Sequence, residues 1–280
     1  MVTTSVRESS YHACAPRSVL RGTISRVWAS RPAEGPAQAV RRVELTLPAA
    51  EMHLVVRLDN NLVDIHALSG EANSFRAGAV GGLRTAAYVK RSTVATTVGA
   101  MVQPGMCAAL LGIPAVEFAG KHVALADVWP ASRLDRLRER LAGAIDAPEM
   151  AAIFEAALIE GLRPDFAPDA WINASLARLR CSGRITDVAD ASGVSHRHFI
   201  HRFREAVGVT PMQFKRLLRF ERLTSRMAAP GASMASIAIA AGFADQAHMA
   251  RDFRRFTGIT ISAYRARVGG HPRHVPAFVP

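Results

Sequence analysis

A near-repeat of about fifty residues in the C-terminal part of the chain constrains the fold more than any other feature. The first copy is RITDVADASGVSHRHFIHRFREAVGVTPMQFKRL (184–217), and the second is SMASIAIAAGFADQAHMARDFRRFTGITISAYRAR (233–267). In each copy a short apolar stretch runs into a glycine, Gly193 or Gly242, which permits the positive φ of a tight turn. Ser195 or Asp245 can then cap a second helix. This order predicts two helix-turn-helix units.

The second helix of each unit is predicted to be amphipathic with a basic outer face. At 100° per residue, Phe199 and Phe203 form the buried stripe in the first copy, while Arg197, His201 and Arg204 point outward. In the second copy we expect Met249, Phe253 and Phe256 to be buried and Ala247, His248, Arg251 and Arg255 to project outward. A single basic helix is more often just a solvated face, but two such faces after matching turns favour helices that lie in a major groove of DNA.

A long helix is predicted between the two units, from Thr210 to Gly231, with Pro211 at its first position. About eighteen helical residues would span roughly 27 Å at 1.5 Å per residue. This length could hold two recognition helices about one duplex turn apart, since major-groove faces repeat every ~34 Å.

The segment from Ala170 to Val268 resembles the AraC/XylS family of transcription regulators. The pattern IAxxxGFxDQxxxxRxF, followed by G-I-T and Y-R, is carried by Ile237, Ala238, Gly242, Phe243, Asp245, Gln246, Arg251, Phe253, Gly258, Tyr264 and Arg265. Two positions depart from the family: Ile261 replaces a usual proline, and Met249 replaces a common core aromatic. The resemblance implies a DNA-binding domain of seven helices with two helix-turn-helix units joined by a long helix.

The resemblance also implies which residues contact DNA. It implies base contacts from Arg197, Ile200, His201, Gln246, Ala247 and Arg251. If the protein is such a regulator, we also expect phosphate contacts from the basic residues Arg202, Arg204, Lys215, Arg254 and Arg255. Arginine suits guanine O6 and N7, glutamine suits adenine, and the apolar Ile200 and Ala247 can contact only groups such as the thymine methyl.

Net charge agrees with a polyanionic partner but does not establish one. The chain has 35 Lys and Arg against 23 Asp and Glu, and from Asp165 onward the count is 17 against 8. Basic residues placed beside phosphates release counterions. Only Lys90, Lys121 and Lys215 are lysines, so a preference for arginine set by coding bias could explain part of the excess.

The first half of the chain is predicted to be β-rich, with added helices. Strand patterns cover 43–47, 53–58, 62–68 and 93–102, with Asp59, Asn60 and Asn61 forming a turn. Helical patterns follow at 105–112, 132–141 and 148–161. The expected fold class is therefore α+β: a β-rich sensor or dimerisation domain (1–162), a linker (163–168), the helical DNA-binding domain (169–268) and a C-terminal tail (269–280). The segment from Pro16 to Leu162 resembles, more weakly, the uncharacterised domain that precedes the DNA-binding region in some of these regulators.

Candidate chemistry in the first half is weak, and no catalytic residue, metal ligand or cofactor is expected. His53 and His66, near Asp59 and Asp64, lack the usual spacing of metal ligands. Gly81 and Gly82 are better interpreted as a turn than as a phosphate-binding loop. Cys107, in the apolar segment GMCAALL, is expected to be an inert buried thiol. Cys14 and Cys181 match no disulfide or metal pattern.

The expected partner is double-stranded DNA, and the resemblance adds a small-molecule effector of unknown identity, RNA polymerase if the protein activates, and a homodimer as further possibilities. No apolar segment is long enough for a signal peptide or a membrane helix, so the expected location is the cytoplasm and its nucleoid. Two alternatives stay open at this point: a cysteine-dependent DNA-repair protein, and a nucleoid-binding protein without sequence preference.

Overall fold

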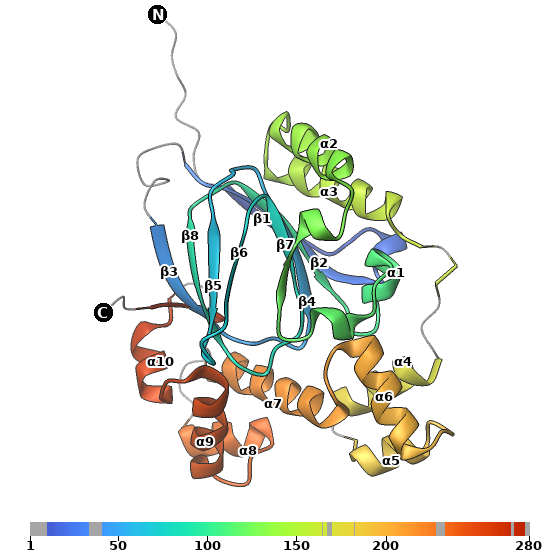
Figure 1. Ribbon diagram of the computed structural model, residues 1–280. Helices are drawn as coiled ribbons and strands as arrows, with labels where there is room; N and C mark the ends of the chain where they lie inside the picture. The colour runs from blue at the N-terminus through green and yellow to red at the C-terminus, as the bar shows by residue number, and fades with distance from the viewer. Residues whose placement is uncertain are drawn as a thin grey trace, which may run out of the picture.

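The computed structural model describes residues 10–33, 41–163, 165–166, 170–181, 183–227, 233–269 and 272–277. Two antiparallel sheets form the N-terminal part, and a layer of helices lies below them (Figure 1). The α+β prediction, a β-rich domain followed by a helical domain, is confirmed.

The first sheet has the strand order β1-β2-β9-β4-β7-β10. Its strands are β1 (Ser10–Cys14), β2 (Ile24–Arg31), β4 (Met52–Arg57), β7 (Gly78–Gly81), β9 (Thr97–Val102) and β10 (His122–Ala124). The second sheet has the order β11-β3-β8-β5-β6. It contains β3 (Arg41–Thr46), β5 (Val63–Ala67), β6 (Ala72–Phe75), β8 (Tyr88–Thr93) and β11 (His274–Pro276).

Alternation along β4 separates two environments. Leu54 and Val56 are fully buried in the main hydrophobic core, which also contains Leu134 and Phe154 of the helices above the sheet. These helices are α2 (Ala131–Ala142) and α3 (Ala147–Glu160), the latter capped by Asp146. Because side chains alternate along a strand, His53 points to the opposite face, toward the second sheet.

The single strand expected at 93–102 is wrong. Thr93 ends β8 in the second sheet and Thr97 begins β9 in the first, so the chain changes sheets between them. The continuous run of β-branched residues hid this change because strand propensity carries no information about which sheet a strand joins. The turn at 59–61 likewise connects β4 and β5, which belong to different sheets.

Short helices complete the first half of the chain. They are α1 (Cys107–Leu111) and the 3-10 helices η1 (Ser18–Leu20), η3 (Ala115–Phe118) and η4 (Leu125–Asp127). The helices predicted at 105–112, 132–141 and 148–161 are confirmed as α1, α2 and α3. Gly81 is the last residue of β7, so the strand extends one residue further than the predicted Gly81–Gly82 turn allows.

The helical region runs from α4 to α10, in agreement with the expected seven helices. Their bounds are α4 (Ala170–Arg180), α5 (Ile185–Asp190), α6 (His196–Val207), α7 (Pro211–Met227), α8 (Met234–Ala241), α9 (Gln246–Thr257) and α10 (Ile261–Arg267). Helix α7 lies between the two helix-turn-helix units and below the sheets (Figure 1). None of the helices in the described segments is long and apolar enough to cross a membrane.

The two halves of the chain contact one another at several points. The amide of Ala87, just before β8, donates a hydrogen bond to the carbonyl of Phe256 in α9 (2.6 Å). The amide of Ala50 donates to Glu221 Oε1 in α7 (2.9 Å). Residues 164 and 167–168 of the expected linker lie outside the described residues, while Arg163 donates its amide to the carbonyl of Ala109 in α1 (2.9 Å).

Candidate nucleic-acid interface

The first recognition helix, α6, is fixed by a cap and an aromatic core. Ser195 Oγ accepts a hydrogen bond from the amide of His198 (3.3 Å), as the sequence predicts. Phe199 and Phe203 are fully buried, and their ring centroids lie 5.9 Å apart. Phe199 also packs against Trp171 of α4, with 5.6 Å between centroids. The helix therefore has one orientation relative to α4 and presents its other face to solvent.

The outward orientation predicted for α6 is confirmed. Arg197, His201 and Arg204 are exposed, and the side chain of Ile200 is 37% exposed among them. Glu205 lies beside this face: its carboxylate pairs with Arg202 (3.0 Å), and its second oxygen lies 3.6 Å from His201 Nε2. The face thus combines two arginines with one aliphatic and one imidazole group.

The second recognition helix, α9, follows the same design. Asp245 Oδ1 accepts from the amide of His248 (2.6 Å), while Met249, Phe253 and Phe256 are buried. The exposed side chains on this helix include Gln246, Ala247, Arg251, Arg254 and Arg255. Both units place positive φ at the turn glycine, 72° at Gly193 and 87° at Gly242.

The prediction that His248 projects outward is wrong. Its ring lies edge-on to Phe243, with 5.4 Å between centroids, and its Nε2 lies 3.9 Å from Asp252 Oδ2. The side chain is 34% exposed, because a residue one turn before Asp252 shares its flank of the helix. His248 therefore packs against the turn that connects α8 to α9.

A buried carboxylate joins α9 to α7. Asp252 Oδ1 accepts from Arg216 Nη2 (3.0 Å), and Asp252 Oδ2 accepts from Arg219 Nη2 (2.6 Å). The guanidinium of Arg219 also lies 4.5 Å from the centre of the Phe243 ring. These contacts fix the direction of the second recognition helix relative to the central helix. Sequence analysis missed Asp252, whose signal was a single acidic residue within a basic helix.

The central helix α7 has 17 residues, which corresponds to about 26 Å. Thr210 and Gln213 form a reciprocal cap: Gln213 Oε1 accepts from the Thr210 amide (2.9 Å), and Thr210 Oγ1 accepts from the Gln213 amide (3.3 Å). Lys215 donates to the carbonyl of Gly183 (2.9 Å) and so ties α7 to the turn after α4. Thr260 caps α10 by accepting from the Ala263 amide (3.1 Å), which fixes the helix start despite Ile261.

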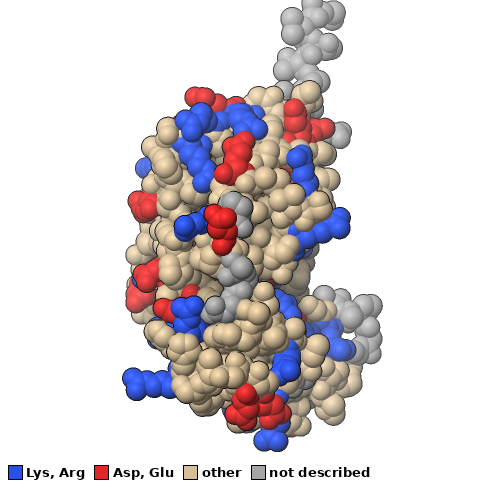
Figure 2. Space-filling model, turned by 90° about the vertical axis from the view of Figure 1, so that its right-hand side faces the viewer, with Lys and Arg blue, Asp and Glu red and all other residues tan. Residues whose placement is uncertain are grey.

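Surface charge alone does not mark a single binding face. In the view of Figure 2, Lys and Arg side chains are interspersed with Asp and Glu over both the upper and the lower part of the molecule. The positions of the exposed side chains on α6 and α9 therefore indicate a DNA-binding face better than net charge does.

A polar cluster lies between the two sheets. The ring of His122 in β10 has its centroid 5.2 Å from that of His53 and 4.6 Å from that of Tyr88. Burial and nearby cations lower the pKa of His53 to about 3, and burial lowers the pKa of His122 well below its usual value, so both imidazoles are neutral. His122 Nδ1 has no hydrogen-bond partner within the described part of the chain. An isolated histidine in a short strand gave no sequence signal for this cluster.

The remaining candidates in the first half have simpler roles. The described segments contain no group of three His, Cys, Asp or Glu side chains placed to hold a metal ion. Cys107 is buried in α1, and burial raises the pKa of its thiol to about 12. Asp64 accepts hydrogen bonds from Ser74 (2.6 Å) and from Arg41. Asp59 pairs with Arg57 (2.8 Å).

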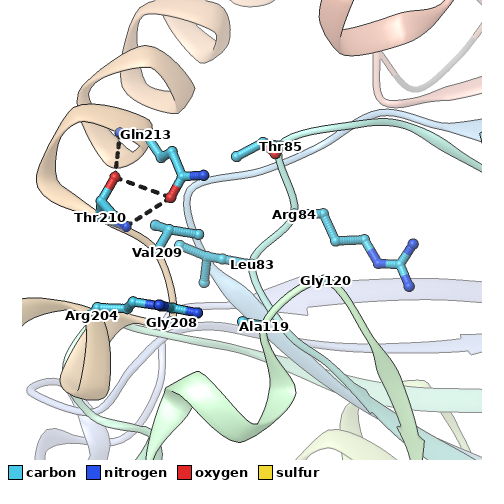
Figure 3. Close-up of a pocket in the computed structure, with 10 residues that line it drawn as sticks. All are labelled: Leu83, Arg84, Thr85, Ala119, Gly120, Arg204, Gly208, Val209, Thr210 and Gln213. Carbon is cyan, nitrogen blue, oxygen red and sulfur yellow. Dashed lines mark hydrogen bonds between the residues drawn. The ribbon is translucent and has the colours of Figure 1, made fainter. Parts of the chain in front are cut away.

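A cavity of about 390 Å³ lies where the sheets meet the first helix-turn-helix unit (Figure 3). Its lining residues are Leu83, Arg84, Thr85, Ala119, Gly120, Arg204, Gly208, Val209, Thr210 and Gln213. In Figure 3 the guanidinium of Arg84 points away from Gln213, and it lies 4.9 Å from the centre of the Tyr88 ring. Arg84 thus connects the rim of this cavity with the polar cluster between the sheets.

Comparison with known proteins gives two domain matches. A helix-turn-helix domain matches residues 188–267, and a domain of unknown function (DUF6597) matches residues 12–124. ToxT from Vibrio cholerae O395 bound to (E)-4-(8-methylnaphthalen-1-yl)but-3-enoic acid has 10% identity and a TM-score of 0.45, covering 92% of this chain and 97% of that one. The AraC-like transcriptional activator CuxR has 13% identity and a TM-score of 0.24, covering 78% and 87%. No curated sequence matches. The two matched regions coincide with β1–β10 and α5–α10.

Proposed function

We propose that this chain is an AraC-type transcription regulator that recognises a specific DNA sequence through α6 and α9, which lie within the matched helix-turn-helix domain. The observation that carries this proposal is the pairing of two capped recognition helices on one central helix, each with an exposed face of hydrogen-bonding side chains. We also propose that the chain is divided into a sensor or dimerisation domain (1–162), a linker (163–168), a DNA-binding domain (169–268) and a C-terminal tail (269–280).

Base recognition falls to the exposed faces of the two helices. Arg197 and Arg251 suit bidentate contacts with guanine, and Gln246 suits adenine. Ile200 and Ala247 offer apolar contact to thymine methyl groups, and His201 can hydrogen-bond a base edge when it is not held by Glu205.

Phosphate contacts position the protein without specifying sequence. The exposed Arg204, Arg254 and Arg255 can make such contacts directly. Arg202 and Lys215 would have to share their charge between DNA and their present partners, Glu205 and the carbonyl of Gly183. They should therefore contribute less than the other three residues.

The N-terminal domain is proposed to bind a small-molecule effector at the polar cluster of His53, His122 and Tyr88. Neutral imidazoles and a phenol hydroxyl form hydrogen bonds without charge, and a buried polar atom that lacks a partner is costly unless a ligand or water satisfies it. We expect a neutral molecule with hydrogen-bonding groups. We also propose that the protein acts on the nucleoid in the cytoplasm, that it can form a homodimer, and that it contacts RNA polymerase if it activates transcription.

Selection of bound sequences from a random DNA pool at near-physiological salt tests the proposal. We expect two short conserved blocks about one helical turn apart and a specificity ratio above ~10³ over scrambled duplex. Binding that enriches no sequence and disappears as salt rises would instead identify a charge-driven binder.

The cysteine-dependent repair alternative is not supported. The helix-turn-helix match at residues 188–267 describes a DNA-binding module, which a regulator and a repair protein could share. However, Cys107, with its raised pKa, lacks the thiolate that alkyl transfer needs.

A further inference from the structure

The last strand, β11, returns from the DNA-binding helices to the sandwich. It pairs with β3 at the edge of the second sheet, with His274 opposite Thr46 and Val275 opposite Leu45. The amide of Leu47 donates to the carbonyl of Arg273 (2.9 Å), and the amide of Ala277 donates to that of Val43 (3.0 Å). In Figure 1 this segment lies beside α10 and the lower end of β3. Residues 274–276 are thus part of the second sheet, together with strands from the first half of the chain.

Side chains on β11 connect it to both halves of the molecule. Val275 is 1% exposed and belongs to the main hydrophobic core. His274 Nδ1 lies 3.3 Å from Glu44 Oε2, and Lys90 Nζ lies 3.0 Å from the same oxygen. On the other side, Tyr264 of α10 donates its hydroxyl to the carbonyl of Pro272 (2.9 Å). A continuous path of contacts therefore runs from α10 to the inner face of the second sheet.

The sandwich contacts each helix-turn-helix unit at a different place. The first unit approaches η3, where a Cβ added at Gly208 would lie 3.0 Å from the carbonyl oxygen of Ala115. The second unit is held by the hydrogen bond between Ala87 and Phe256 and by β11. Without these contacts only α7 and its packing would set the angle between the two recognition helices.

We propose that β11 acts as a clamp that fixes the second helix-turn-helix unit relative to the first and so sets which spacing of two DNA blocks the protein accepts. His274 and Val275 are the positioning residues, and both lie on β11, outside α6 and α9. The inference rests on the proposed sequence-specific binding. One added base pair moves a block by about 3.4 Å and rotates it by roughly a tenth of a turn, which a clamped unit cannot follow.

The first test measures the clamp without DNA. Spin labels at Ala191→Cys and Ile239→Cys, both exposed and one on each unit, report the distance between the units in a Cys14→Ser, Cys181→Ser background. We expect a narrow distance distribution that broadens in Val275→Asp, together with faster hydrogen exchange at the amides of Leu47 and Ala277. Faster exchange with an unchanged distribution overturns the clamp, whatever the protein does with DNA.

The second test measures affinity for the selected DNA and for versions with one base pair added or removed between the blocks. We expect the unaltered protein to lose about tenfold or more on altered spacing and Val275→Asp to lose less than about threefold. Thr46→Cys with His274→Cys, added to Val275→Asp, restores the penalty on oxidation, because residues opposite one another in an antiparallel pair lie within disulfide range.

Controls separate the clamp from general effects. Oxidation of His66→Cys with Ala72→Cys, a facing pair on β5 and β6 of the second sheet, should leave spacing preference unchanged. If Val275→Asp does not fold, His274→Ala at a half-exposed position gives the same comparisons with a smaller effect. Spacing penalties equal to that of the unaltered protein in every folded variant refute the inference, whereas a protein that enriches no sequence refutes the proposed function.

Discussion

Replacing Asp252 by alanine should destabilise the second helix-turn-helix unit by about 2–3 kcal/mol. Asp252 is 7% exposed and accepts hydrogen bonds from two arginines of α7. Removing one partner of a buried ion pair costs roughly 3–5 kcal/mol. Arg216 and Arg219 keep 29% and 24% of their side chains exposed, so water can solvate them after the change and lower this cost.

The same pair predicts a pH dependence. Burial alone raises the pKa of Asp252, but hydrogen bonds and charge interactions with Arg216 and Arg219 hold this pKa below its ordinary value of 3.8. A carboxyl with a lowered pKa in the folded state stabilises the protein above its unfolded pKa and loses this contribution as pH falls through its folded pKa. The alanine variant should therefore lose less stability than the unaltered protein as pH falls below about 4.

Urea unfolding at pH 7 and at steps down to pH 3 measures both effects, with Asp190→Ala as a matched control because Asp190 is exposed on α5. The control should change the free energy of unfolding by less than about 0.5 kcal/mol. A loss for Asp252→Ala no larger than that of the control would refute the view that this carboxylate fixes α9 to α7.

Three further predictions concern single side chains. Arg251→Ala should lower specific affinity by ~1–3 kcal/mol and relax preference at one base pair, as measured by titration against single-base variants, whereas an equal loss on every sequence would make Arg251 a phosphate ligand. The hydrogen bond with His274 lowers the pKa of Glu44 to about 2, so the Glu44 carboxylate stabilises the folded protein above its ordinary pKa of 4.5 and loses this contribution as pH falls toward 2. Glu44→Gln should remove this contribution, and acid unfolding of the variant that matches the unaltered protein would contradict it. Cys107→Ser should leave the number of rapidly reacting thiols unchanged, since the thiol with a pKa of about 12 is protonated at neutral pH, and loss of a fast-reacting thiol would show the reverse.

The helical region could be predicted because its signals are local. Phe199 and Phe203 recur at helical spacing, and Ser195 and Asp245 cap the helices that follow them. The buried face and the first residue of each recognition helix can therefore be predicted from about fifteen residues of sequence. The prediction for His248 was wrong, because its side chain contacts Phe243 and Asp252. Helical periodicity places these residues near His248, but it does not predict whether the imidazole contacts them or points to solvent.

The β-sandwich could be predicted only in part, because its strands are defined by distant partners. The strand β7 has the sequence GAVG, which carries neither alternation nor β-branched enrichment, yet it pairs with β4 and β10. The strand β11 has three residues, and one of them is proline. Its place is set by β3, more than two hundred residues earlier in the chain. No local pattern could have assigned either strand.

The hydrogen bonds between the two halves have free energies in the range that coupling between two sites of a regulator requires. Hydrogen bonds between the two halves include Ala87 to Phe256, Ala50 to Glu221, and the short pairing of β11 with β3. Each hydrogen bond contributes a net ~1 kcal/mol, and coupling between sites in allosteric proteins is typically about 1–3 kcal/mol. A ligand at the polar cluster that favoured one arrangement of β11 by that amount would be enough to change how the second recognition helix is held. Buried apolar residues of both halves belong to one hydrophobic core, so such a ligand would act by shifting these polar links and not by separating the halves.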